Sequence, residues 1–201
     1  MTVCHASSID STIWPRLYQL DKLIAEEVQS CNCPYCGAVL HVAMYPRKPR
    51  GVSREQLGET YCSRFSFCCS ECRRRCTPPS VRFLGRKVYL GVMVVLAAAA
   101  AQGLNDQRYK KLVEHLSLSR YTLQRWLTWW QEQLPETPFW RQLQGRVPSI
   151  SQIPLPTAIL DRLAGDVLVR CQRLLVTLMP LTTQSCSHCP TVSAFAQKMS
   201  V

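Results

Sequence analysis

Four cysteines in the first half of the chain have the spacing of a metal site. Cys33 and Cys36 form one Cys-x2-Cys pair, and Cys69 and Cys72 form a second. Two residues between ligands allow one tight turn to present both sulfurs, and four thiolates suit the tetrahedral coordination of Zn²⁺. Gly37 directly follows the first pair, where a positive φ is often needed. The sequence therefore predicts one structural zinc ion held by these four thiolates.

The spacer between the two pairs is long, with 32 residues between Cys36 and Cys69. Zinc ribbons usually separate their pairs by roughly 15–20 residues. We expect the proline-containing basic segment 46–51 to form a loop that absorbs the extra length. The identity of one ligand is undecided, because Cys68 is adjacent to Cys69 and could pair with Cys72 across three residues. Cys69 is preferred, since it keeps the two-residue spacing in both pairs.

The other cysteines are interpreted as small buried apolar residues or as incidental thiols. Three of them lie near the two pairs, namely Cys31, Cys62 and Cys76. Near the C-terminus, Cys186, His188 and Cys189 resemble half of a metal site without partners. A disulfide framework is the rival explanation for so many cysteines. Residues 1–12 lack the basic start and apolar run of a signal peptide, so we expect a reducing compartment, the cytoplasm, with association to the nucleoid.

The chain is strongly basic, with a formal net charge of +11 and a pI near 9.3. This charge favours a polyanionic partner. It is concentrated in residues 73–87, which contain six basic residues and no acidic one, and in the spacer between the cysteine pairs. The two basic clusters consist of Arg73, Arg74, Arg75, Arg82, Arg86 and Lys87, and of Arg47, Lys48, Arg50 and Arg54. Because they flank the predicted zinc site, we expect contacts with phosphate groups.

The predicted fold is mainly α-helical, with a small β zinc-ribbon-like module and a tri-helical helix-turn-helix. Five segments are expected: a helical leader (1–30), a Cys4 zinc-ribbon-like module (31–80), a helix-turn-helix domain (81–134), a Pro-rich connector (135–156), and a C-terminal helix with a mobile tail (157–201). The leader helix is indicated by apolar residues near helical spacing, Leu17, Leu20, Leu23, Ile24 and Val28. Short strands are expected at 39–43 and 64–67, and the last helix at 157–179.

Residues 88–104 contain no charged side chain. A membrane helix needs about 20 mostly apolar residues, and this stretch is shorter and interrupted by Gly91, Gln102 and Gly103. Its alanine run, residues 97–101, favours a helix whose small side chains let neighbouring helices approach closely. We therefore expect a buried helix and no membrane contact.

Two short helices follow this apolar stretch. Asn105 or Asp106 can cap a helix that continues to Leu116, and Ser119 can cap a second helix over residues 120–134. Two short helices joined by about three residues fit a helix-turn-helix. The second helix presents polar side chains near its N-terminal end, where a recognition helix contacts base edges: Arg120, Tyr121, Thr122, Gln124 and Arg125. Trp126, Trp129 and Trp130 are interpreted mainly as core residues.

The order of these parts resembles the zinc-ribbon plus helix-turn-helix region of bacterial insertion-element transposases and transposase accessory proteins. The resemblance covers about residues 31–134 and includes both cysteine pairs. It implies that Cys33, Cys36, Cys69 and Cys72 hold zinc, and that Arg120, Thr122, Gln124 and Arg125 face DNA. Such transposases also carry a separate acidic catalytic domain, whereas only three acidic residues follow Leu134 here, namely Glu136, Asp161 and Asp166.

The function expected from these features is that of a zinc-containing, double-stranded-DNA-binding protein of a mobile genetic element, an accessory or regulatory factor. Arg73, Arg74 and Arg75 are expected to contact the DNA backbone. A transposase or recombinase encoded nearby and a second copy of the chain are the expected protein partners. The alternative is a zinc-dependent protein–protein or RNA-binding adaptor. An enzyme is disfavoured, because four Cys ligands leave no open coordination position and the four histidines are scattered.

Overall fold

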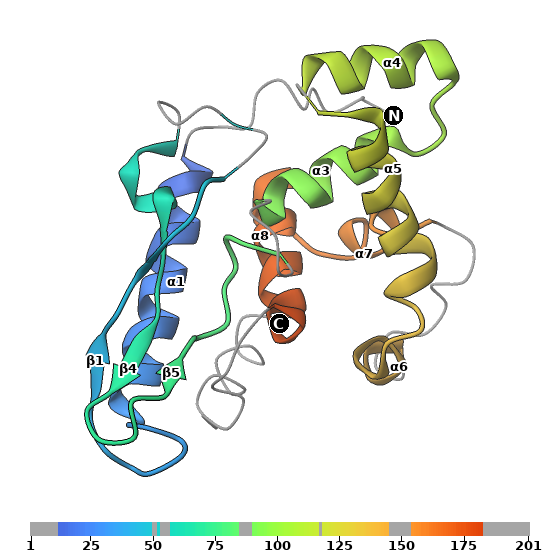
Figure 1. Ribbon diagram of the computed structural model, residues 1–201. Helices are drawn as coiled ribbons and strands as arrows, with labels where there is room; N and C mark the ends of the chain where they lie inside the picture. Colours follow the sequence, from blue (N-terminus) through green and yellow to red (C-terminus); the bar gives the residue numbers. More distant parts are fainter. Residues whose placement is uncertain are drawn as a thin grey trace. The chain divides into compact units, whose positions relative to one another are not determined.

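The computed structural model describes residues 12–49, 52, 57–84, 90–116, 118–144 and 154–182 (Figure 1). The chain forms two compact units, which we describe separately. The cysteine unit comprises Ser11–Gly91 and Leu175–Val201, and the helical unit comprises Met1–Asp10 and Val92–Leu174. The described structure is mainly helical with a small antiparallel sheet, which confirms the predicted fold class at this level.

The cysteine unit begins with helix α1, Ile13–Ser30. Pro15 lies in its first turn, where a backbone N–H has no intrahelical partner and proline is tolerated. The buried face repeats at helical spacing and includes Ile13, Leu17, Leu20, Ile24 and Val28. The leader helix is therefore confirmed. The assignment of Leu23 to its apolar face is wrong, because that side chain is 51% exposed.

Two small antiparallel sheets follow α1. The first has the order β1-β4-β5, with β1 at Leu40–Val42, β4 at Phe67–Cys69 and β5 at Arg75–Cys76. Its register pairs Leu40 with Cys69 and Phe67 with Cys76. The second pairs β2, Tyr45–Pro46, with β3, Ser63–Arg64, which follows a short 3-10 helix η2 at Glu59–Cys62.

The predicted strand at 39–43 is confirmed, whereas the strand at 64–67 is divided between β3 and β4 by Phe65 and Ser66. The sheet lies beside α1 (Figure 1). A compact apolar cluster joins the two. It contains Ala25, Val28, Cys33, Leu40, Phe67, Cys69 and Cys76. Two of the four predicted zinc ligands therefore belong to the core of this unit.

The helical unit contains the two capped helices that the sequence predicts. Helix α3, Gly91–Ala101, is the expected buried alanine-rich helix. Helix α4, Asp106–His115, is capped by Asn105, whose side chain accepts a hydrogen bond from the Arg108 backbone N–H. Helix α5, Arg120–Thr128, is capped in the same way by Ser119, which accepts from the Thr122 backbone N–H. None of the described helices has the length and apolar character needed to cross a membrane.

Beyond α5, the helical structure continues over the predicted range, and one further helix forms that the sequence does not predict. A π-helical turn, η3 at Trp129–Gln133, extends α5, and helix α6, Pro138–Gln144, lies within the predicted connector. Thr137 caps α6 by accepting from the Trp140 backbone N–H, and Pro138 occupies its first position, a combination that starts helices. Trp140 is only 2% exposed.

The predicted single helix at 157–179 is two helices, α7 at Thr157–Leu160 and α8 at Val167–Leu178, followed by a 3-10 turn η4 at Met179–Leu181. Gly165 has a φ of +107° between them, a conformation that a helix cannot contain. Asp166 then starts α8, since its side chain accepts from the Val169 backbone N–H. The predicted mobile tail begins after Pro180, but Leu181 ends η4 and Thr182 is buried, so the start of this prediction is wrong. The rest of the predicted tail, residues 183–201, lies outside the described part of the chain.

Candidate metal centre and nucleic-acid interface

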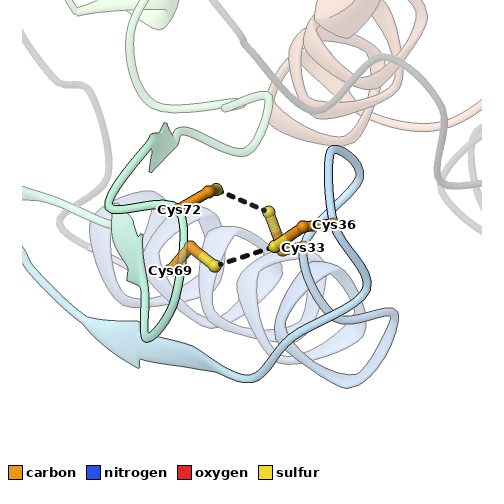
Figure 2. A group of neighbouring side chains, drawn as sticks. All are labelled: Cys33, Cys36, Cys69 and Cys72. Carbon is orange, nitrogen blue, oxygen red and sulfur yellow. Dashed lines mark hydrogen bonds between the residues drawn. The ribbon is translucent and has the colours of Figure 1, made fainter.

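The structure brings together the four cysteines that the sequence predicts as zinc ligands. The Sγ atoms of Cys33, Cys36, Cys69 and Cys72 all lie within 4.8 Å of one another. Cys33 Sγ is 3.6 Å from Cys72 Sγ, and Cys36 Sγ is 3.3 Å from Cys69 Sγ (Figure 2). Zn–S bonds of about 2.3 Å in a tetrahedron place sulfurs about 3.8 Å apart. The cluster therefore has the dimensions and donor atoms of a tetrahedral zinc site.

The first knuckle is a turn fixed by backbone hydrogen bonds directly after α1. The Gly37 N–H donates to the Cys33 carbonyl at 2.8 Å, and the Cys33 N–H donates to the Ala38 carbonyl at 2.8 Å. Gly37 has a φ of +76°, as the sequence predicts. This turn presents Cys33 and Cys36 on the same side of the backbone (Figure 2).

The second knuckle is the connection between β4 and β5. The Cys69 N–H donates to the Arg74 carbonyl at 3.1 Å. This hydrogen bond closes the turn that contains Cys72. Arg73 has a φ of +57°, a left-handed conformation that is uncommon outside glycine. The two knuckles meet because β1 and β4 pair in register, with Leu40 opposite Cys69. The sheet thus brings together the two ends of the long spacer and places the second cysteine pair beside the first.

The cluster combines buried and exposed thiols with different acidities. Cys33 and Cys69 are 4% and 1% exposed, whereas Cys36 and Cys72 lie nearer the surface. Burial raises the pKa of Cys69, but hydrogen bonds from the backbone of Cys72 and Glu71 outweigh it and lower that pKa to about 6. A backbone hydrogen bond from Arg74 lowers the pKa of Cys72, but burial and the neighbouring thiols raise it to about 12. Four thiols this close cannot all ionise alone, and a bound dication would compensate their charge.

Cys68, the alternative ligand, is not part of the cluster. Its Sγ lies 3.8 Å from the Cys69 carbonyl and 3.5 Å from the Arg73 carbonyl. Successive side chains of a strand point to opposite faces, so β4 can direct only one of these two neighbours toward the first knuckle. Cys31, Cys62 and Cys76 also lie outside the described cluster. Cys76 is disulfide-bonded, so its interpretation as an incidental thiol is wrong. The predicted half-site at Cys186, His188 and Cys189 falls on residues outside those described.

The three arginines after the second knuckle are exposed on the cysteine unit. Arg74 stacks on Tyr35 of the first knuckle, with its Cζ 4.7 Å from the ring centroid. Arg75 donates through Nη1 to the Ala43 carbonyl at 3.0 Å and to Ser66 Oγ at 3.3 Å. The sequence shows the charge of this run but not these tyrosine and backbone contacts, which restrict where the guanidinium groups can lie.

In the basic cluster of the spacer between the cysteine pairs, Arg47 donates to the Tyr45 hydroxyl at 2.9 Å, and Lys48 is exposed. Arg50, Arg54, Arg86 and Lys87 fall outside the residues described. The structure therefore places only part of the predicted basic surface.

The assignment of Arg82 to the phosphate-binding cluster is wrong. Its side chain is 0% exposed and forms an ion pair with Asp21 of α1. Its Cζ lies 5.1–5.3 Å from the ring centroids of four aromatic residues, Tyr18, Tyr61, Phe65 and Phe83. A phosphate group cannot reach it there. The one signal in the sequence was an acidic residue, Asp21, at a position of α1 that helical spacing places among buried residues.

The predicted DNA-facing residues lie in the first two turns of α5, where they differ in their contacts. Arg120 Nη2 lies 3.3 Å from Asp106 Oδ1, in an exposed ion pair. Thr122 Oγ1 lies 2.8 Å from Ser119 Oγ, so this hydroxyl belongs to the helix cap. Gln124 is exposed, and Arg125 is half-buried.

The three tryptophans of this segment are mostly internal, as predicted. Trp126 is 6% exposed and Trp130 is 0% exposed. Trp129 is half-buried and packs edge-on against Trp130, with a centroid separation of 4.9 Å. These indoles anchor one side of α5, and the polar residues lie on the other.

No family model, curated protein or solved structure matches this chain. The resemblance to transposase zinc-ribbon and helix-turn-helix regions therefore stays a prediction from the sequence.

Proposed function

We propose that this chain is a zinc-containing DNA-binding protein of a mobile genetic element, with an accessory or regulatory role in transposition. The observation that carries the proposal is the position of three exposed arginines, Arg73, Arg74 and Arg75, immediately after the last cysteine of the cluster. A structural zinc ion makes the fold of such a turn depend on the metal. The arginines would then form a fixed basic surface that meets the phosphate backbone.

The role of the zinc ion is structural in this proposal. Four thiolates fill the tetrahedral coordination shell and leave no position for a water molecule or substrate. The cluster would fix both knuckles and the start of β5, and we propose no catalytic activity for it.

We assign recognition of the DNA sequence to the helical unit. We propose that α3, α4 and α5 form a tri-helical helix-turn-helix whose recognition helix is α5. In such domains the N-terminal residues of the recognition helix contact base edges in the major groove. Arg120, Gln124 and Arg125 supply the guanidinium and amide groups that make paired hydrogen bonds with guanine and adenine. The buried Trp126 and Trp130 would hold the opposite side of α5.

A second candidate function, a zinc-dependent adaptor for a protein or RNA partner, is favoured by a different observation. The cysteine unit exposes several large apolar side chains, namely Tyr35 (50%), Val39 (57%), Val42 (63%) and Met44 (41%). Three of these side chains lie within residues 39–44, and contiguous exposed apolar surface is typical of protein-binding sites.

A binding comparison tests the proposal against this alternative. Zinc-loaded protein would be titrated into fluorescent duplex DNA and single-stranded RNA of equal length, with fluorescence anisotropy as the readout. We expect binding to the duplex that the triple variant R73A/R74A/R75A weakens strongly. The control R16A/K22A removes two exposed charges from α1 and should keep most of the affinity. Failure to bind duplex DNA at low salt would favour the adaptor.

A further inference from the structure

Tyr121 has the highest exposed fraction among the large apolar side chains in the described residues. The side chain is 72% exposed and lies in the first turn of α5, the part of a recognition helix that approaches base edges. Exposed aromatic rings of this kind are enriched where proteins make contacts, because they supply a large apolar area and a polar tip.

The contacts of the residues around Tyr121 show which other polar side chains of α5 are available on the same surface. Arg125, one helical turn further on, has its Cζ 5.7 Å from the Tyr121 ring centroid. Thr122 is engaged with the cap residue Ser119, and Arg120 is paired with Asp106. Tyr121, Gln124 and Arg125 therefore form the part of this surface that is not tied to the helix cap or to α4.

We infer that Tyr121 is a specificity-determining residue that contacts the C5-methyl group of a pyrimidine in the major groove. In unmodified DNA this pyrimidine is thymine. The inference rests on the proposed function of α5 as a recognition helix. In an intact duplex each base face is covered by its stacked neighbours, so an aromatic ring inserted from the groove meets base edges only. The C5-methyl group is the apolar feature of those edges, and it distinguishes thymine from cytosine.

The Tyr121–Arg125 contact also limits where this thymine lies. Successive base pairs are separated by about 3.4 Å along the duplex axis. Two side chains only 5.7 Å apart consequently reach the same base pair or adjacent ones. Because arginine pairs best with guanine, the preferred site should contain a thymine next to a guanine.

The test uses the full zinc-loaded chain and removes the methyl group alone. A preferred duplex is first selected from a random pool, and each thymine is then replaced in turn by deoxyuridine. We expect one replacement, beside a guanine, to weaken binding about fourfold, the value of one buried methyl group. Placing 5-methylcytosine, paired with guanine, at that position should bind more tightly than unmodified cytosine there, which separates methyl recognition from recognition of the thymine carbonyl.

Variants of exposed tyrosines complete the test. Tyr121→Ala should lose the uridine sensitivity at that position, and Tyr121→Phe should keep it. Tyr35→Ala, which removes an exposed ring from the cysteine unit, should keep it as well. Uridine sensitivity that persists in Tyr121→Ala, or none in the wild-type protein bound to its selected site, would overturn the inference and leave DNA binding by α5 intact. Failure of the selection to yield any preferred duplex would overturn both the inference and the proposed sequence reading.

Discussion

Nε of Arg82 lies 2.7 Å from Oδ2 of Asp21 inside the cysteine unit. The same carboxylate accepts hydrogen bonds from Ser80 Oγ and from the Val81 backbone N–H, each at 2.6 Å. Arg82 also donates through Nη1 to the Thr60 carbonyl at 2.7 Å. This ion pair therefore joins α1, the 3-10 helix η2 and the segment that follows β5.

Removal of Asp21 should destabilise the cysteine unit strongly. Asp21→Ala leaves the Arg82 guanidinium buried without its counter-ion, a change that typically lowers the free energy of unfolding by about 3–5 kcal/mol. Urea unfolding of zinc-loaded protein, followed by circular dichroism, would measure the loss. The matched control is Glu26→Ala on the same helix, which breaks an exposed ion pair with Lys22 and should cost at most about 1 kcal/mol. Equal losses in the two variants would contradict the buried ion pair.

The cysteine cluster should bind one zinc ion per chain. Cys36→Ser removes one ligand and should abolish stoichiometric zinc in metal analysis of the purified protein. Cys68→Ser is the control and should retain it, because Cys68 lies outside the cluster. A loss of zinc in Cys68→Ser equal to that in Cys36→Ser would show that Cys68 is a ligand and that the assigned set of four cysteines is wrong.

Chelation should unfold the module that the ion holds together. The free energy of zinc binding at a structural site is largely free energy of folding. Treatment with a strong chelator should therefore expose the amides of β1, β4 and β5 to hydrogen exchange. The amides of α5 should keep their protection, which serves as the internal control. Unchanged protection of the sheet after complete zinc removal would show that the fold does not need the metal.

Cys171 should be unreactive in the folded protein. It is 0% exposed on α8, and burial raises the pKa of its thiol to about 12, so the reactive thiolate is scarce at pH 8. Iodoacetamide labelling with peptide mass spectrometry should modify Cys171 much more slowly than Cys68, which is only partly buried. In urea the two rates should become similar. Rapid native labelling of Cys171 would contradict its burial.

The features that the sequence predicts well are local. The caps at Asn105 and Ser119 depend on residues within three positions, and the knuckle turn with Gly37 depends on its own backbone. The contact between Asp21 and Arg82 joins residues 61 positions apart, so the charge of Arg82 alone suggested a surface role. The break between α7 and α8 at Gly165 was not predicted, because apolar residues at helical spacing precede and follow it. From the sequence, only the two-residue spacing favours Cys69 over Cys68 as a ligand. In the structure, the pairing of β1 with β4 gives the physical reason, because it directs the Cys69 side chain toward the first knuckle.

The salt dependence of DNA binding should measure the phosphate contacts of the cysteine unit. The logarithm of affinity falls with the logarithm of salt concentration by about 0.9 for each phosphate contact. The variant R73A/R74A/R75A should reduce the slope by up to about three, and equally on selected and scrambled duplexes. An unchanged slope would show that these arginines do not contact the backbone.

Arg125 should affect sequence preference rather than overall affinity. It extends from the second turn of α5 beside Tyr121, and Trp126 next to it is buried, which fixes the rotation of the helix. If Arg125 contacts a guanine edge, Arg125→Ala should cost about 1–3 kcal/mol on the selected duplex and much less on a scrambled one. Arg74→Ala is the matched control, because an arginine that contacts only phosphate should weaken both duplexes alike. Titration of both variants against both duplexes at one salt concentration separates the two roles. Equal weakening of the two duplexes by Arg125→Ala would mean that α5 contacts the backbone without reading the sequence.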